Sequence, residues 1–272
     1  MSGVPRAVGL VAAAVCAAAL AQAPEKAFEP VVGQPGKDVI WGPTPPELVE
    51  KMLDMARVTA ADYVMDLGSG DGRMVIAAAK RGARALGVEY EPEMVALARR
   101  SAAEQGVAER ASFVQGDMYE ADISQATVLA LFLLPDNLRR LTPKFLAMKP
   151  GSRIVSNGFP IEGWQADELD TLPACYDWCT ALLYTVPAKV AGTWRLPQGT
   201  LRIRQDFRKL SGELVSGSSR TALANPTLSG ERIGFTIGLT QFTGRVRGGV
   251  MSGDATGAYH GRWEAIRIGH DH

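Results

Sequence analysis

The apolar residues follow two different periodicities along the chain, and the change between them falls near residue 190. Between residues 63 and 186, short apolar runs typical of buried strands are separated by segments with helical spacing. From Ala191 onward, apolar and polar residues alternate one by one, and turns rich in Gly and Ser separate the alternating segments. The pattern therefore predicts an α/β fold with a mostly parallel sheet and helices on both faces, followed by a small C-terminal antiparallel β module.

The same periodicities predict the individual elements. Strands are expected at residues 63–67, 84–89, 111–115, 126–133, 153–156 and 180–186, and helices at residues 45–57, 71–81, 91–105 and 138–148. Thr44 is expected to be the N-cap of the first helix, with Pro45 at the first helical position and Glu47 completing a capping box. Residues 161–171 lack periodicity and predict an irregular surface flap. The β module is expected to curl around Trp194 and Trp263 as a partial barrel.

These patterns divide the chain into residues 1–23, a linker at residues 24–37, an α/β domain at residues 38–188 and the β module at residues 189–272. In the first part, residues 8–21 are an apolar run behind one basic residue, Arg6. The run suits the core of a signal peptide and is short against the about 20 residues that cross a bilayer. A cleaved signal peptide and an uncleaved anchor both stay open. The protein is therefore expected to be exported (periplasmic) or membrane-associated.

The formal net charge is zero, but the charges are unevenly distributed. Residues 188–272 hold 12 Lys or Arg against 6 Asp or Glu, so the β module is basic and the rest of the chain is acidic. The arginines are either solvated on strand faces or form a patch that recruits an acidic partner or anionic lipid. Nucleic-acid binding is not expected, because these arginines alternate with core positions.

The stretch from Tyr63 to Glu89 carries the clearest chemistry. A short buried strand ends at Gly68, Gly70 and Gly72, where the backbone can approach a ligand without Cβ atoms in the way. A helix and a second strand that ends on Glu89 follow. Strand, glycine turn, helix, strand and acid form half of a Rossmann-like nucleotide-binding unit.

The residues around the glycines distinguish between two cofactors. A dinucleotide loop has the spacing G-x-G-x-x-G, whereas this loop has G-x-G-x-G, which disfavours an NAD enzyme. Asp66 lies two residues before the first glycine and Asp71 lies inside the loop. Two carboxylates would repel a pyrophosphate but suit a ligand with an ammonium and a sulfonium, such as S-adenosylmethionine. Glu89 is placed to accept hydrogen bonds from both ribose hydroxyls.

Residues 64–72 (VMDLGSGDG) resemble the first motif of the class I S-adenosylmethionine-dependent methyltransferases, and residues 87–89 (GVE) resemble their second. The run 66–80 (DLGSGDGRMVIAAAK) is most similar to the mitochondrial lysine methyltransferases that act on the ATP-synthase c-subunit and to their bacterial relatives. Residues 148–156 also resemble a strand of the non-SET histone-lysine methyltransferases. The similarity covers roughly residues 39–194. It is specific for fold and cofactor and suggestive for substrate.

The resemblance implies a set of cofactor-binding residues from the segment before the first helix, the glycine loop and two further strand ends. These are Thr44, Asp66, Gly68, Ser69, Gly70, Asp71, Gly72, Glu89, Asp117 and Met118. It also implies that Asp117 accepts a hydrogen bond from the adenine amine and that Met118 packs on the adenine ring. Trp41 and Thr44 are candidates for lining the methionine end of the site, although a hydrophobic staple onto the sheet is an equal alternative.

No catalytic base can be named, but the ligand site of an open α/β sheet lies at the carboxyl ends of its strands. The candidates on this rim are Leu134, Pro135, Asn137 and Asn157. Many adenine-modifying methyltransferases have Asn-Pro-Pro-Tyr after the corresponding strand. This chain has Leu-Leu-Pro-Asp at residues 133–136, which argues against base methylation. Asn157 could hold a substrate nitrogen or be a turn residue.

No histidine or cysteine cluster has metal-ligand spacing, so no metal site is expected. Cys175 and Cys179 would form a small disulfide in an exported protein and would be buried thiols otherwise.

The expected function is that of an S-adenosylmethionine-dependent methyltransferase that N-methylates a lysine of a protein substrate. A small-molecule acceptor stays open because nothing at residues 134–137 dictates a protein. The rival from another class is an exported binding protein that uses the basic β module and keeps the cofactor fold as a vestige.

Overall fold

The computed structural model describes residues 3, 28–173, 175 and 178–269. The predicted signal peptide or anchor at residues 1–23 lies almost entirely outside these residues. In chain order, the α/β domain consists of α1 (Pro46–Met55), β1 (Tyr63–Leu67), α2 (Arg73–Lys80), β2 (Arg84–Glu89), α3 (Pro92–Glu104), β3 (Ala111–Gln115), β4 (Val128–Leu131), α4 (Pro135–Phe145), β5 (Arg153–Asn157), β6 (Glu168–Thr171) and β7 (Thr180–Thr185). None of the helices in the described part of the chain is both long and apolar enough to cross a bilayer.

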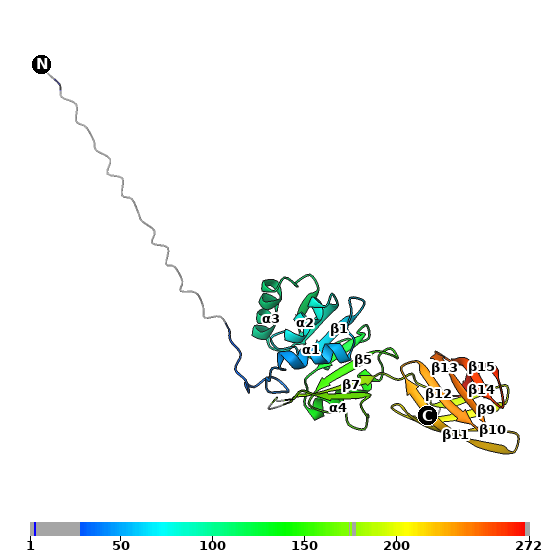
Figure 1. Cartoon of the computed structure of the whole chain (residues 1–272). Coiled ribbons are helices and arrows are strands. Elements are labelled where there is room, and N and C mark those ends of the chain that lie inside the picture. Colours follow the sequence, from blue (N-terminus) through cyan, green and yellow to red (C-terminus); the bar gives the residue numbers. More distant parts are fainter. Residues whose placement is uncertain (1–2, 4–27, 174, 176–177, 270–272) are drawn as a thin grey trace.

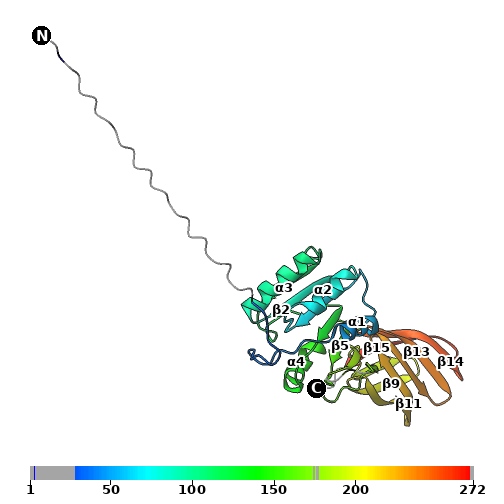
Figure 2. The same ribbon diagram turned by 60° about the vertical axis from the view of Figure 1, so that its left-hand side comes forward.

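The described strands of this domain form a seven-stranded sheet in the order β3-β2-β1-β4-β5-β7-β6. Strand β7 runs antiparallel to both of its neighbours, and the other pairs are parallel. Side chains alternate across the sheet, so Val64 packs in the core under α1, α2 and α3, whereas Met65 packs in the core under α4. Figure 2 shows α2 and α3 side by side on the sheet. The predicted mostly parallel sheet with helices on both faces is confirmed.

Three local predictions are wrong. Thr44 does not cap α1: the N-cap is Pro45, without a side-chain bond, because the Thr44 hydroxyl instead accepts a hydrogen bond from Asn157 Nδ2 at 3.2 Å. The predicted flap at residues 161–171 contains an edge strand, β6, which pairs with β7. The predicted strand at residues 126–133 is only four residues long, because the chain leaves the sheet at Phe132 and turns into α4.

The C-terminal unit consists of β8 (Gly192–Leu196), β9 (Gly199–Asp206), β10 (Lys209–Ser216), β11 (Ser219–Ser229), β12 (Arg232–Ile237), β13 (Thr240–Arg247), β14 (Val250–Gly257) and β15 (Gly261–Gly269). These strands close into a barrel in which β15 pairs with β8. Trp194 and Trp263 lie in its core, and their indole nitrogens donate to the carbonyl oxygens of Val190 and Thr243, each at 2.9 Å. The antiparallel module is therefore confirmed, and it is a closed barrel rather than a partial one.

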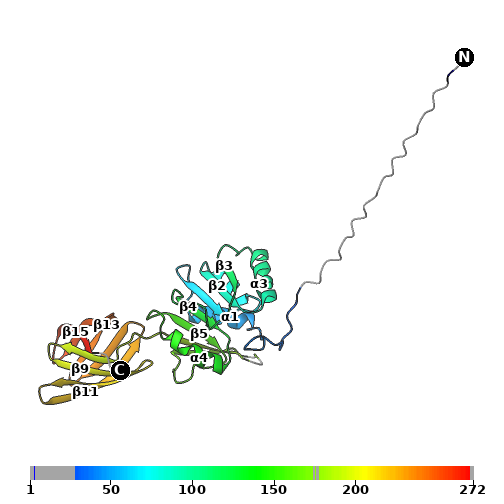
Figure 3. The ribbon, with the colours of Figure 1, turned by 180° about the vertical axis from the view of Figure 1, so that it is seen from behind.

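The barrel and the α/β domain lie side by side (Figure 1). The Phe207 ring stacks on Trp164 with 5.3 Å between ring centroids, and Arg208 pairs with Asp167 at 3.0 Å. The turn at Gly230 accepts a hydrogen bond from the Ala188 amide at 2.8 Å. Seen from behind, the barrel and the segment that precedes α1 lie on opposite sides of the α/β domain (Figure 3).

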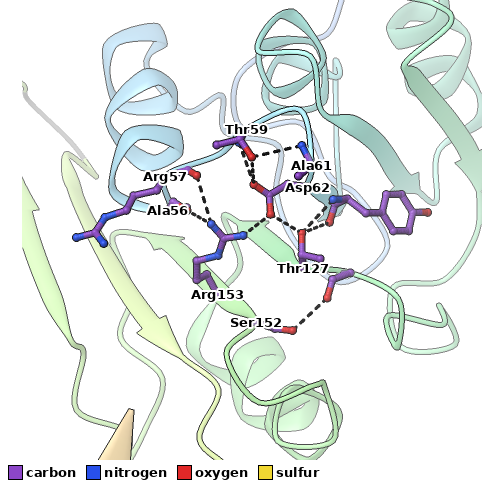
Figure 4. Close-up of polar contacts among 10 residues, drawn as sticks. Ala56, Arg57, Thr59, Ala61, Asp62, Thr127, Ser152 and Arg153 are labelled. Carbon is purple, nitrogen blue, oxygen red and sulfur yellow. Dashed lines mark hydrogen bonds and ion pairs between the residues drawn. The ribbon is translucent and has the colours of Figure 1, made fainter. Parts of the chain in front are cut away.

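At the amino ends of the central strands, a polar network is built around the buried Asp62 (Figure 4). The Asp62 carboxylate accepts hydrogen bonds from the Thr59 amide at 2.9 Å and the Thr127 hydroxyl at 2.7 Å, and it pairs with Arg153. Although burial opposes ionisation, these bonds and the Arg153 charge lower the pKa of Asp62. The network therefore links the starts of β1, β4 and β5 at the edge opposite their carboxyl ends.

Candidate active site

A cavity of about 330 Å³ lies at the carboxyl ends of β1, β2, β3 and β4. Its wall is formed by the glycine loop at residues 68–71, the loops at residues 88–91 and 116–118, and the end of β4 at residues 130–134. Residues 32–44, here called the strap, also line the cavity. This is the edge of the sheet at which ligands bind in open α/β folds.

The strap is a short, hydrogen-bonded segment that contains part of the predicted linker. Pro35 and Ile40 form a β-bridge, and the Trp41 amide donates to the Gln34 carbonyl at 2.9 Å. The indole of Trp41 lies against the glycine loop, since a Cβ added to Gly70 would lie 2.8 Å from Trp41 Nε1. Lys37 pairs with Asp117 and lies 4.8 Å from the centroid of a neighbouring tyrosine ring. The strap therefore bounds the cavity along both the glycine loop and the loop after β3.

The glycine loop has the left-handed backbone that its residue types permit. Gly68, Gly70 and Gly72 have φ angles of 79°, 52° and 84°. The Gly70 amide donates to Glu89 Oε2 at 2.8 Å, and the other carboxylate oxygen of Glu89 accepts from the Glu91 amide at 3.0 Å. Gly72 does not line the cavity; it is the N-cap of α2, and an added Cβ would lie 2.7 Å from the Phe113 ring.

Asp66 is the buried acid of the cavity wall, and no cation among the described residues pairs with it. Burial, followed by the charges of Glu89 and Asp71, raises the pKa of Asp66 to about 8. Asp71 has its own partner, because Arg73 binds its carboxylate at 2.6 Å. Asp62 and Asp66 therefore differ: Arg153 balances the charge of Asp62, whereas no described cation balances the charged form of Asp66, which is held neutral at pH 7.

Other groups also fit the ligand that the resemblance implies. The buried hydroxyl oxygen of Ser69 has no hydrogen-bond partner within the described residues, so the cavity wall offers an unused polar group. Asp117 lines the cavity with both oxygens engaged, by Lys37 and by the Tyr119 amide at 2.9 Å. Lys37 is the main cause of the lowered pKa of Asp117. Thr44 and Met118 also line the cavity.

Only one of the four rim candidates lines the cavity. Leu134 lines the cavity, whereas Pro135, Asn137 and Asn157 do not. Asn137 is buried within α4, where its Nδ2 donates to the Tyr119 hydroxyl at 2.7 Å. Asn157 is the fully buried last residue of β5, so the interpretation as a turn residue is wrong. Asn137 and Asn157 therefore position neighbouring segments and do not line the cavity.

Sequence reasoning missed an aromatic part of the wall, which is formed by Phe132, Phe159 and Trp178. Phe132 follows β4 directly and Phe159 lies two residues after β5, so their position after a strand end could have indicated them. Trp178 had no such signal, and it precedes Cys179, which is bonded to Cys175 in the disulfide that was one of the two expected alternatives. Among the described residues, no group of His, Cys, Asp and Glu side chains could hold a metal ion.

Comparison with known proteins agrees with this geometry. Residues 66–168 match the family described as the ANTKMT methyltransferase domain. A protein-lysine N-methyltransferase of Saccharolobus islandicus is 45% identical over 134 residues, which are 48% of this chain and 83% of that protein. The human lysine N-methyltransferase named for the ATP synthase c-subunit is 33% identical over 128 residues, and the match spans 47% of this chain and about half, 54%, of the human protein.

A solved structure is also similar over most of its own length. An RNA methyltransferase from Salinibacter ruber, in complex with S-adenosyl-L-homocysteine, has 42% sequence identity and a TM-score of 0.52. The similarity covers 55% of this chain and 96% of that one. The Saccharolobus islandicus and Salinibacter ruber proteins are both named as methyltransferases, and their names differ in the kind of acceptor.

Proposed function

This chain belongs to the class I S-adenosylmethionine-dependent methyltransferases, in the family that includes the protein-lysine N-methyltransferases, and from that premise we propose that it methylates a lysine side chain of a protein. The observation that carries the proposal is the 45% identity to a protein-lysine N-methyltransferase over most of that protein's length. The residues that match the family model, 66–168, include the glycine loop and the strand ends that line the cavity.

When bound, S-adenosylmethionine supplies a methyl carbon on a sulfonium: the acceptor nitrogen bonds to this carbon as its bond to sulfur breaks, the electron pair stays on sulfur, and the product ammonium releases a proton to water. We assign the unpartnered Asp66 to the ammonium end of the ligand, Glu89 to the ribose hydroxyls and Asp117 to the adenine amine. The buried, cation-free carboxyl of Asp66 supports this orientation, because a positive ligand would compensate its burial.

The acceptor end of the cavity is apolar. Its wall at residues 42–44, 130–134, 159 and 178 carries no carboxylate and no histidine. The amine must therefore lose its proton before it attacks, and these residues contribute by orienting it and by excluding water.

The affinity for S-adenosylmethionine is expected to rise about tenfold per pH unit between about pH 6 and pH 7.5. Because the pKa of Asp66 is raised to about 8, the free site holds a proton in this range that a cationic ligand must displace. The range ends below the point at which a free α-amino group, with a pKa of about 8, loses its own proton. Isothermal titration calorimetry in buffers of different ionisation enthalpy should detect release of about one proton per ligand at pH 7. A pH-independent affinity would contradict the assignment of Asp66.

The acceptor can be identified with S-adenosylmethionine labelled with tritium in the methyl group, incubated with cell extract. The label is expected in protease-sensitive, nuclease-resistant material and, after hydrolysis, in methyl-lysine. The Gly70→Arg variant is the control, because its side chain would fill the cavity against Trp41. Label that nuclease releases would instead support RNA as the acceptor, as in the name of the Salinibacter ruber protein. Label confined to small molecules would support a small-molecule acceptor.

We also propose that the protein works in an exported or membrane-associated location. The disulfide between Cys175 and Cys179 supports this proposal, since such bonds persist in oxidising compartments. The apolar residues 8–21 support it as well.

A further inference from the structure

We infer that Phe132, Phe159 and Trp178, here called the aromatic wall, bind the ammonium group of the acceptor lysine and hold it equally well after it has been methylated. The inference rests on the proposed function and deepens it. It names the residues that receive the side chain and the number of methyl groups that the side chain can carry there.

The three rings come from three segments that the fold brings together. Phe132 follows β4, Phe159 lies two residues after β5, and Trp178 lies two residues before β7. The Phe132 centroid is 6.5 Å from that of Phe159, with 18° between the ring planes, and 5.7 Å from that of Trp178, with 57° between the planes. All three rings line the cavity that also contains Asp66.

The aromatic wall is joined to the cofactor part of the cavity through the sheet. Asp66 pairs with Ala130 in the register of β1 and β4, and Phe132 lies two residues further along the same chain. A group that rests on Phe132 is therefore at the strand end next to the acidic groups assigned to the cofactor. This position is where a methyl acceptor has to lie.

Phe159 packs against the hydrophobic core, but the other two rings lie outside it. Neither Phe132 nor Trp178 belongs to the packed clusters of the α/β domain, and Trp178 is 47% exposed. Trp178 also has a φ angle of 49°, a conformation that is uncommon for a bulky residue. A large apolar ring that lines a cavity in this conformation, next to a disulfide-bonded cysteine, is better explained by contact with a ligand than by packing.

The chemistry of the rings indicates which ligand fits. An aromatic face attracts an alkylammonium ion through its quadrupole, without needing an N–H donor. A carboxylate would favour an ammonium that still has N–H groups to donate, but none of the described residues in this part of the wall carries one. Lysine and its mono-, di- and trimethylated forms should therefore all be held, so the site permits successive transfers up to trimethyl-lysine.

The test measures binding without methyl transfer, so its failure is separate from failure of the proposed function. The probe is Nα-acetyl-Nε-trimethyl-lysine amide, and its partner is the neutral analogue with a tert-butyl group in place of the trimethylammonium group. Both are titrated by NMR into the full chain saturated with S-adenosyl-L-homocysteine, which keeps the charged probe away from Asp66 and Glu89.

The charged probe is expected to bind at least about fivefold more tightly than the neutral one, as one cation–π contact of about 1 kcal/mol implies. Trp178→Leu and Phe132→Leu should each remove about this factor, whereas Trp178→Phe should keep most of it. Tyr259→Leu, which changes an exposed aromatic residue of the barrel, should have no effect. Each variant is first shown to bind S-adenosyl-L-homocysteine like the unchanged protein.

Equal binding of the two probes, no binding of either, or unchanged binding in Trp178→Leu would overturn the inference. Adenosine monophosphate is added as a third probe. If it bound to the aromatic wall in preference to the charged probe, the rings would be a stacking surface for a base, and the inference would also be overturned.

Discussion

Replacing Asp66 with asparagine should weaken the binding of S-adenosylmethionine about 100-fold and, in the same variant, stabilise the ligand-free protein. The first effect follows because the variant keeps the shape of the residue but loses the charge that would meet the cationic end of the ligand. Loss of one partner of a buried, hydrogen-bonded charge pair costs about 2–5 kcal/mol of binding free energy. Calorimetric titration of both proteins at pH 7 measures this difference.

The second effect has the opposite sign because of the pKa of about 8. An aspartate whose pKa is higher in the folded than in the unfolded chain contributes fully to stability below the unfolded value of about 4, and this contribution is lost as pH rises toward the folded value. At pH 8, Asp66→Asn should therefore raise the free energy of unfolding by an amount on the order of 5 kcal/mol. At pH 4 the two proteins should be equally stable.

Urea unfolding at pH 4 and pH 8 checks the prediction, and Asp62→Asn is the matched control. Asp62 is also buried, but it is paired with Arg153 and its pKa is lowered, so its replacement should destabilise the protein at neutral pH. If Asp66→Asn destabilised the protein in the same way, Asp66 would be a structural acid and its assignment to the ligand would be wrong.

The second large effect is expected at Gly72, where an alanine should destabilise the fold by about 3 kcal/mol. Two effects contribute to this loss of stability. An alanine in a left-handed backbone conformation costs about 1 kcal/mol, and overpacking costs about 1–3 kcal/mol. The φ angle of Gly72 is 84°. The new Cβ atom would lie 2.7 Å from the Phe113 ring and 2.8 Å from Ala98 Cβ. Phe113 and Ala98 are buried, so neither can move aside easily.

Gly106→Ala separates the two contributions. Gly106 has a φ angle of 69°, but an added Cβ would have nothing within 4 Å. Its replacement should therefore cost only the backbone part, about 1 kcal/mol. Urea unfolding of the two variants at one pH measures the difference. Equal losses would mean that the close approach of α2 to α3 and β3 contributes nothing to the requirement for glycine in the loop.

The sequence predicted those parts of the molecule in which neighbouring residues determine the structure. The strand at residues 63–67, the glycine loop and α2 carry their own apolar pattern and turn residues, so they lie where expected. Thr44 shows the limit of such reasoning. Its local context is that of a helix cap, but Asn157, 113 residues away, binds its hydroxyl group. Only the three-dimensional structure reveals that competition.

The same limit explains what was missed at the cavity. The strap at residues 32–44 has no periodicity, and its position depends on contacts such as that between Trp41 and the glycine loop. Trp178 reaches the wall because of a disulfide and a tertiary contact with Phe132. The acids that line the cavity were found because their spacing follows the strand ends. The remaining wall residues come from segments whose pattern contains no such information.

The attachment of the barrel has a consequence for the size of the acceptor. Two of the contacts between the barrel and the α/β domain, at Gly151 just before β5 and at Ala188 just after β7, lie at the edge of the sheet opposite the cavity. A partner that bound the barrel near these contacts would have to reach from this edge to the opposite one before its lysine met the transferring methyl. A short peptide could engage only one of the two places, whereas a large protein, or one fixed in a lipid layer, could engage both.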